Sequence, residues 1–451
     1  MNTSTINKPA NSSLIPMMII GGLFFIFGFI TWLNGALVPF LQIVCDLNEI
    51  QAILIASTFY FAYVVMALPM AFVLEYTGYR KAMSVGLGLI ALGCIMYIPA
   101  AQSQSFLLFL AAQFCLGTGL TLLQTASNPY IVKIGPEETA AVRISIMGIL
   151  NKFAGVIAPI VFTSLVLGEF SGVTAQSIAL LSEAERVTQI TALADGLIVP
   201  YTGMAIALSI LALALLKSGL PELNLNASDA NAEIGAPVAS GPITTKALFA
   251  FPHLVLGVAT LFVYVGVEVI AGDTIGLFGS SLGLANATTL TSYTMAFMVI
   301  GYVIGLMVIP RLMTERQALL GSAVLGMILS IAVVFSSSTS TAVSSVLWGW
   351  TGIGLLPDTI TFVALLGFAN AIVWPAIWPL ALKGLGELTA KGSALLIMGI
   401  AGGALLPLVY GALSSMVGNQ NAYWMMLPCY LFIFYYALIG CRKAPSGQYR
   451  S

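Results

Sequence analysis

The hydrophobic positions of this chain gather into twelve long runs that are separated by short polar breaks. The runs cover residues 17–43, 51–74, 82–101, 105–132, 142–167, 197–216, 248–278, 290–310, 317–336, 360–382, 393–416 and 423–441. A helix of about twenty apolar residues crosses the roughly 30 Å hydrocarbon core of a bilayer. The pattern therefore predicts an all-α integral membrane protein with twelve transmembrane helices.

One polar stretch divides the twelve runs six and six. Residues 217–246 form the longest hydrophilic segment inside the chain, and they are rich in Ala, Ser, Asn, Pro and Gly, as linkers are. We therefore expect an N-terminal six-helix half over 1–216, a cytoplasmic linker over 217–246 and a C-terminal six-helix half over 247–451. The first apolar run is far too long for a cleavable signal, so we expect no processing of the N-terminus.

Composition narrows the class of protein. Of the 451 residues 59% are hydrophobic and only 7% are charged, whereas about 25% are charged in a soluble globular chain. The net charge is −1 and no basic cluster occurs, so nothing indicates nucleic-acid binding. The five cysteines lack metal-ligand spacing and are interpreted as free thiols. His253 is the only histidine, and no catalytic triad or metal cluster can be assembled around it, which argues against an enzyme.

The distribution of Lys and Arg predicts the orientation in the membrane. With the N-terminus inside, all but two of the sixteen basic residues fall at or near the cytoplasmic face; the exceptions are Lys152 and Arg186. The positive-inside rule then places both termini in the cytoplasm. Short loops, and the lack of a glycosylation signal in the external 168–196 loop, favour a bacterial inner membrane.

The two halves resemble each other in sequence. Residues 128–159 align with 378–407, and the alignment matches prolines, lysines, glycines and the string I-M-G-I: Pro129 with Pro379, Lys133 with Lys383, Gly135 with Gly386, 146–149 with 397–400, and Pro159 with Pro407. Repeats of six spans that run in the same direction are the plan of the major facilitator fold. The repeat therefore predicts two six-helix halves related by pseudo-two-fold symmetry, with a substrate site between them near the midplane.

Several amides and indoles interrupt the apolar runs and suit a sugar. Polar groups inside a bilayer usually face protein or a water-filled cavity. Amides can hydrogen-bond to neighbouring hydroxyls, and indoles offer an apolar face with a single donor. The predicted sugar-binding residues are Asn34, Gln124, Asn128, Asn151, Glu268, Asn370, Trp374 and Trp378. The last three follow one another at spacings of four. The alternative is that the asparagines only join helices and the tryptophans only pack.

Three charged residues lie within the predicted spans. In SIMGILNKFAGVIAPIVF (145–162), Lys152 falls near the bilayer centre, where a charge costs roughly 2.5–3.5 kcal/mol on insertion scales. Glu268 and Asp273 are the only carboxylates that we place in the hydrocarbon region. They point about 140° apart on an ideal helix, unless Ala271 and Gly272 loosen it. Our hypothesis is that Lys152 pairs with Asp273 or Glu268 across the halves, and that these three residues take part in ion coupling; the alternative is that Lys152 snorkels.

Two longer blocks carry a family resemblance. LQTASNPYIVKIGPEE (123–138) and WPAIWPLALKGLGELTAKGSALLIMGIAGGALLP (374–407) resemble the fucose and glucose/galactose symporter family of the major facilitator superfamily, over about residues 20–440. WLNGALVPFLQ (32–42) and YVGVEVIAGDTI (264–275) are most similar to its sodium-dependent glucose transporter branch. The resemblance implies a secondary active transporter that imports a hexose, namely glucose, galactose or mannose, by alternating access.

The match to the family is uneven. The proton-carrying Asp and Glu of its fucose members fall on Gly35 and Gln124, which cannot titrate. A sugar-binding Asn is matched by Asn151, whereas a sugar-binding Gln is replaced by Gly148. Three possibilities remain: coupling to sodium, coupling to protons through Glu268 or Asp273, or no coupling. We expect sodium, because a hard cation needs several oxygen ligands and the amides with a carboxylate could supply them; the ligands themselves are unknown.

One cytoplasmic loop resembles a gate motif. EYTGYRKA (75–82) is similar to a degenerate form of the superfamily's cytoplasmic gate, with Glu75, Gly78, Arg80 and Lys81 pairing against neighbouring helix ends; positive-inside topology explains the two basic residues equally well. We expect a monomer in lipid that binds hexose and sodium, uses no other cofactor and does not bind nucleic acid. The rival interpretations are a proton-coupled sugar symporter and a membrane sugar sensor that does not transport.

Overall fold

The structure is a computed structural model that describes residues 14–134, 140–166, 177–178, 180–222, 245–284, 286–309, 311–385 and 388–443. Within these ranges every regular element is helical. Twelve segments are long and apolar enough to cross a membrane. The prediction of an all-α membrane protein with twelve transmembrane helices is therefore confirmed.

The first six spans come from the N half, which we define as residues 14–217. Their helices are α1 (Leu14–Trp32) with α2 (Asn34–Val44), α3 (Glu49–Thr77), α4 (Tyr79–Ser103), α5 (Phe106–Lys133), α6 (Ala140–Val166) and α9 (Ile198–Lys217). The last six spans form the C half, residues 252–443. Their helices are α10 (Pro252–Ser281), α11 (Leu290–Val308), α12 (Glu315–Phe335), α14 (Asp358–Asn370) with α15 (Val373–Leu382), α16 (Thr389–Met398) with η7 (Gly399–Ala401) and α17 (Gly402–Val417), and α18 (Asn419–Ala422) with η8 (Tyr423–Met425) and α19 (Met426–Leu438).

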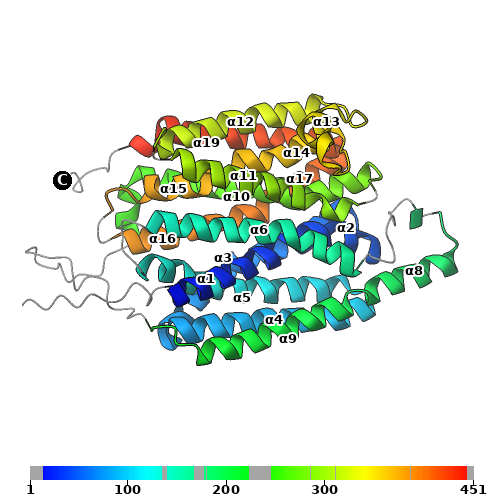
Figure 1. The fold of residues 1–451 in the computed structure, drawn as a ribbon, viewed down its shortest axis with the longest axis horizontal. Helices are drawn as coiled ribbons and strands as arrows, with labels where there is room; N and C mark the ends of the chain where they lie inside the picture. The colour runs from blue at the N-terminus through cyan, green and yellow to red at the C-terminus, as the bar shows by residue number, and fades with distance from the viewer. Residues whose placement is uncertain are drawn as a thin grey trace, which may run out of the picture.

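The two halves lie one above the other in Figure 1, with the N half below and the C half above. All the spans run nearly parallel to the long axis of the molecule, so the bundle has two ends. We call the end at which α9 stops and α10 begins the linker end, and the opposite one the α8 end. Most of the predicted linker, 223–244, lies outside the described residues, so its boundaries stay a prediction.

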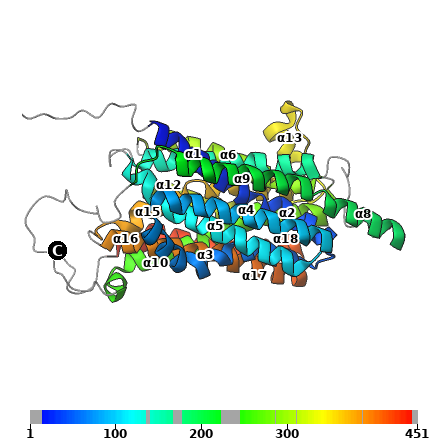
Figure 2. The same cartoon turned by 90° about the horizontal axis from the view of Figure 1, so that it is seen from below.

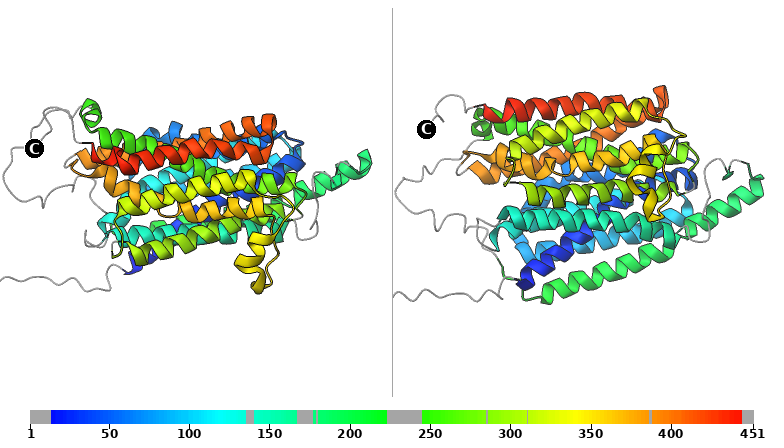
Figure 3. Two further views of the ribbon diagram at one scale, coloured as in Figure 1. Left: turned by 90° about the horizontal axis from the view of Figure 1, so that it is seen from above. Right: turned by 45° about the horizontal axis from the view of Figure 1, so that its top comes forward.

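Two helices lie at the α8 end that the sequence analysis did not predict. α8 (Glu183–Asp195) occupies part of the expected 168–196 loop, and α13 (Ala342–Trp348) follows α12. Both project from the bundle in Figure 2, and the views of Figure 3 show the same. The start of α8 carries a readable signal, because the Ser182 backbone amide donates to the Glu185 carboxylate at 3.1 Å, as in a capping box.

Three helix pairs make the most extensive contacts between the halves: α6 with α11, α3 with α17, and α2 with α10. Glycine allows the closest of these approaches. A Cβ atom on Gly35 of α2 would lie 2.0 Å from Oγ1 of Thr291 and 2.8 Å from the Gly272 carbonyl oxygen. No side chain fits at Gly35 in this arrangement, so α2 and α10 meet backbone to backbone.

Candidate functional site

A buried ion pair joins the two halves at the middle of the bundle. Lys152 lies near the centre of α6 and Glu268 near the centre of α10, and Nζ of Lys152 is 2.5 Å from Oε1 of Glu268. The two residues are 8% and 6% exposed. This is one of the two pairings that the sequence analysis offered. Because each charge neutralises the other, neither half can move away here without leaving an unpaired charge in a dry environment.

Trp32, at the end of α1, holds both Lys152 and its neighbour. The Lys152 ammonium lies 4.3 Å from the centroid of the Trp32 ring, a cation–π distance. Nε1 of Trp32 donates to Oδ1 of Asn151 at 3.4 Å, and Nδ2 of Asn151 donates to the Phe24 carbonyl oxygen at 3.4 Å. Asn151, which the resemblance implies binds sugar, is thus oriented by α1.

Glycines make room for the Trp32 ring. A Cβ atom on Gly155 of α6 or on Gly272 of α10 would come within 2.6 or 2.5 Å of that ring. The ring therefore sits between both halves. The sequence analysis quoted Trp32 only for the resemblance and did not select it as a site residue, although its position beside Asn34 was available as a signal.

An aromatic row continues from Glu268 along the C half. Tyr264 lies one turn before Glu268 on α10, its ring is 6.4 Å from that of Trp374, and Trp374 is 5.7 Å from Trp378. The buried donors of Tyr264 and Trp378, a hydroxyl and an indole nitrogen, have no hydrogen-bond partner among the described residues. Both indole side chains are half-buried. Donors without a partner beside accessible ring faces are what a polyhydroxylated ligand requires.

The predicted stripe of Asn370, Trp374 and Trp378 is not a single helical stripe. α14 ends at Asn370 and α15 begins at Val373, so a break separates the amide from the indoles. Asn370 is fully buried, and its Oδ1 accepts a hydrogen bond from the Tyr430 hydroxyl at 2.9 Å. The prediction of one continuous stripe was wrong, because the helix is interrupted at residues 371–372 and the hydrophobic pattern of the sequence gives no sign of this interruption.

The other predicted amides fall into two groups. Asn34 is buried, and its Oδ1 accepts from Nε2 of Gln113 at 2.7 Å, which joins α2 to α5. Like the hydrogen bond between Tyr430 and Asn370, this contact joins two neighbouring helices. Gln124 and Asn128 on α5 are half-buried, and neither side chain bonds to another described residue. Sugar binding by Asn34, Asn370, Gln124 and Asn128 stays a prediction. Of these, Gln124 and Asn128 have amides that no described residue occupies.

Asp273 is not brought to Lys152. α10 is continuous from Pro252 to Ser281, so the loosening at Ala271 and Gly272 that would have brought Asp273 nearer does not occur. Asp273 lies closer to the α8 end than Glu268 does and is 2% exposed, and neither of its carboxylate oxygens has a hydrogen-bond partner among the described residues.

The predicted gate motif lies at the linker end, in the turn between α3 and α4. Gly78 takes a φ of +78°, which favours glycine. Nε of Arg80 is 3.5 Å from Oε1 of Glu222, and its Nη1 donates to the Ser218 carbonyl oxygen at 3.3 Å, just past the end of α9. Arg80 thus pairs with the segment that directly follows α9, as expected for a helix-end contact. Glu75 and Lys81 are exposed and form no ion pair with another described residue.

Polar contacts close the α8 end. Glu49, at the start of α3, accepts hydrogen bonds from Oγ of Ser414 at 2.6 Å and from Nδ2 of Asn419 at 3.0 Å, both from the C half. Thr163 and Thr288 are hydrogen-bonded across the halves at 2.7 Å. Within the described ranges, the side-chain hydrogen bonds between the halves are these and the Lys152 pair. The structure is therefore closed at the α8 end.

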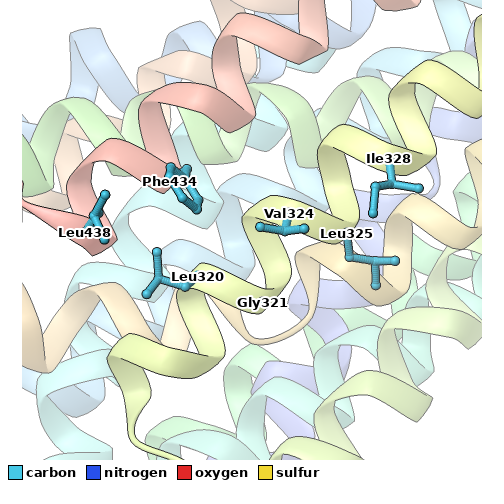
Figure 4. Close-up of a pocket in the computed structure, with 7 residues that line it drawn as sticks. All are labelled: Leu320, Gly321, Val324, Leu325, Ile328, Phe434 and Leu438. Atoms are coloured by element: carbon cyan, nitrogen blue, oxygen red, sulfur yellow. The ribbon is translucent and has the colours of Figure 1, made fainter.

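A shallow groove between α12 and α19 lies apart from this site (Figure 4). Its lining is wholly apolar: Leu320, Gly321, Val324, Leu325, Ile328, Phe434 and Leu438. It contains none of the predicted site residues and no group that could bind a polar ligand, so we assign it no part in the site.

Twelve spans in two halves, closed around a buried ion pair, define a membrane transporter. A family model described as Major Facilitator Superfamily matches residues 20–401, and the chain belongs to that superfamily. It is a transporter and not an enzyme.

Comparison with individual transporters shows which members of the superfamily this chain resembles. The chain is 33% identical to a glucose/galactose transporter of Brucella abortus, over 93% of each chain, and 28% identical to the L-fucose-proton symporter of Escherichia coli, over 95% of this chain and 93% of that one. The crystal structure of a Major Facilitator Superfamily transporter, FucP, in the outward conformation matches with a TM-score of 0.70 at 25% identity, over 96% of this chain and 100% of that one. The resemblance to the fucose and glucose/galactose symporter family is confirmed; its sodium branch stays a prediction.

Proposed function

We propose that this protein imports a hexose by symport with a cation through alternating access. Four side chains without a hydrogen-bond partner among the described residues support a sugar ligand: the donors of Tyr264 and Trp378 and the amides of Gln124 and Asn128. The indoles of Trp374 and Trp378 are half-buried. The relatives named glucose/galactose transporter and L-fucose-proton symporter point to the same class of ligand. Glucose, galactose and mannose are the candidate sugars.

The observation that carries the proposal is the ion pair of Lys152 with Glu268. It lies at mid-membrane, joins the two halves, and has the indole of Trp32 on one side and Tyr264 one turn away on the other. A sugar bound among these residues would contact both halves at once, so its binding can favour one relative position of the halves. Rocking of the halves about this site would then expose the sugar at the two ends in turn.

The coupling ion has two candidates. Sodium is the ion that the sequence predicts, through the resemblance to the sodium branch. The proton is favoured by Asp273, because this carboxylate is buried and the described part of the chain holds no group of three or more His, Cys, Asp or Glu side chains that could bind a metal ion. A sodium ion needs several oxygens, whereas one proton neutralises a carboxylate without any.

We propose a bacterial inner membrane with both termini in the cytoplasm, and a monomer as the working unit. The support is the position of the basic residues, because Arg80, Lys217, Arg316 and Lys383 all lie at helix ends of the linker end. The positive-inside rule makes this the cytoplasmic face. In that orientation the α8 end is external, and the contacts of Glu49 belong to a state that is closed to the outside.

Uptake into proteoliposomes tests the function. Labelled glucose is offered under an inward sodium gradient at equal pH, and separately under an inward proton gradient without sodium. Accumulation in either condition supports hexose symport and identifies the ion. Failure to accumulate or exchange glucose, galactose or mannose in both conditions would overturn the proposal.

Two variants test the site. Asn151→Ala and Trp374→Ala are expected to weaken sugar binding about tenfold or more, because each removes a direct contact of roughly 1–3 kcal/mol. Trp350→Ala is the matched control, since Trp350 is 84% exposed in η5 (Gly349–Thr351), away from the site. Sugar affinity is measured by equilibrium binding; unchanged affinity in both site variants would exclude this site.

A further inference from the structure

The segment between α12 and α14, residues 336–357, leaves the bundle sideways at the α8 end, and we call it the α13 arm. Figure 2 and the left view of Figure 3 show the arm pointing away from the bundle across its long axis, whereas α8 continues along that axis. The spans run nearly parallel to the long axis, so the membrane plane lies across it. The arm therefore extends over the surrounding lipid, and α8 points into water.

The α13 arm is uncharged, and its apolar side chains are exposed. No Asp, Glu, Lys, Arg or His occurs in residues 336–357. Trp350 is 84% exposed, Val346 82% and Ile353 51%. By contrast, α8 contains acidic residues and an arginine. A group of exposed apolar side chains outside the spans indicates an interaction surface, and the lack of charge indicates that its partner is apolar.

The α13 arm is fixed in place by its other tryptophan. Trp348 is buried, and its ring lies 5.6 Å from that of Tyr293 on α11. Nε1 of Trp348 donates to the Gly354 carbonyl oxygen at 3.2 Å, and Oγ of Ser344 donates to the Leu356 carbonyl oxygen at 2.7 Å. These bonds join the two sides of the arm. Trp350 is thus held outward by a folded segment.

The α13 arm continues a group of aromatic residues at the same end of the C half. Phe335, the last residue of α12, is 75% exposed, and its ring lies edge-on to that of Trp424 at 5.7 Å. Trp424 is 41% exposed and lies in η8, at the start of the last span. Trp and Tyr are enriched where membrane spans meet the headgroups. Phe335 and Trp424 thus mark the membrane boundary from which the arm extends.

We propose that the α13 arm is a membrane anchor, which inserts Val346, Trp350 and Ile353 into the boundary between headgroups and acyl chains at the α8 end. Apolar faces at this boundary are buried by about 5–10 Å. Since the arm has no charge, its insertion depends on the apolar layer and not on the charge of the headgroups. In the proposed orientation the anchor lies in the external leaflet and ties the C half to it.

Tryptophan fluorescence of the reconstituted full-length protein tests the anchor. The emission that is lost in Trp350→Phe is the emission of Trp350. It is measured in vesicles of phosphatidylcholine with bromine on the acyl chains, and separately in ordinary vesicles with iodide in the water. We expect brominated lipid to remove most of the Trp350 emission and iodide to remove little. Quenching by brominated lipid should stay the same when anionic lipid replaces part of the phosphatidylcholine.

Val187→Trp, added to Trp350→Phe, is the matched control, because Val187 is 56% exposed on α8. This tryptophan should be quenched by iodide and not by brominated lipid. If Trp350 is quenched by iodide alone, the arm lies in water and the proposal is overturned. Protection of Trp350 from both quenchers also overturns it, since protein, such as a second copy of this chain, then covers the arm. The measurement needs neither sugar nor an ion gradient, so its result is separate from that of the transport assay.

Discussion

A single ammonium group determines how the centre of this molecule is arranged. Replacing Lys152 with Ala leaves Glu268 buried and unpaired, and breaking such a pair typically costs about 3–5 kcal/mol. We expect Lys152→Ala to lower the unfolding temperature clearly, and Lys152→Ala with Glu268→Ala to recover part of the loss, because the double variant buries no charge. Thermal unfolding in detergent measures both, with the exposed Lys81→Ala as the control. Equal stability of the single variant and the wild type contradicts the pair.

At this scale the sequence predicted the charges better than their surroundings. Lys152 and Glu268 could be selected because ionisable residues are rare in apolar runs and costly there. Whether Lys152 pairs with Glu268 or with Asp273 depends on the rotation of α10 about its own axis. The spacing of the two acids in the sequence does not determine that rotation. Trp32 and Tyr264 were missed because aromatic residues in a membrane helix ordinarily pack, and only the contacts distinguish these two.

Contact between whole helices depends on small residues, and α2 against α10 is the clearest case. A Cβ atom at position 35 would lie 2.0 Å from Oγ1 of Thr291, and overpacking of this kind typically costs about 1–3 kcal/mol. We expect Gly35→Ala to favour an open α8 end and to slow sugar uptake. Gly22→Ala is the matched control, because a Cβ atom there meets nothing within 4 Å. Uptake of Gly35→Ala at the rate of Gly22→Ala counts against this close contact.

The spans themselves were predictable, since length and apolarity are enough to identify a membrane helix. The interruptions were not. α1 gives way to α2 at Leu33 and α14 to α15 after Asn370. Both breaks lie beside an asparagine, Asn34 or Asn370, but a single amide inside an apolar run does not by itself indicate a break. α8 was missed for a different reason, because its capping residues Ser182 and Glu185 were present in the sequence but were read as part of a loop.

For the whole molecule, the repeat between the halves predicted the architecture, but no sequence pattern indicates which end is closed. That state is a balance between contacts at the two ends, and the contacts of Glu49 with Ser414 and Asn419 join residues more than 360 positions apart. Pairs so distant cannot be recognised from one sequence. The conformational state therefore had to come from the structure.

The contacts of Glu49 give a prediction for the balance itself. Each hydrogen bond to the carboxylate contributes roughly 1.5–3 kcal/mol, and both are made only when the α8 end is closed. Glu49→Ala should therefore shift the population toward the open state by about tenfold or more, because every 1.4 kcal/mol changes an equilibrium tenfold. Hydrogen–deuterium exchange reports the shift, and we expect faster exchange at the start of α3 and at the end of α17.

The matched control is Glu75→Ala, at the opposite end of the same helix, where the side chain is exposed and no ion pair with a described residue is lost. Its exchange at the α8 end should equal that of the wild type. If Glu49→Ala behaves like Glu75→Ala, the hydrogen bonds of Glu49 do not hold the halves together. Closure must then depend on the packing of α2, α3 and α6 against α10, α17 and α11, and Gly35→Ala should open the α8 end where Glu49→Ala does not.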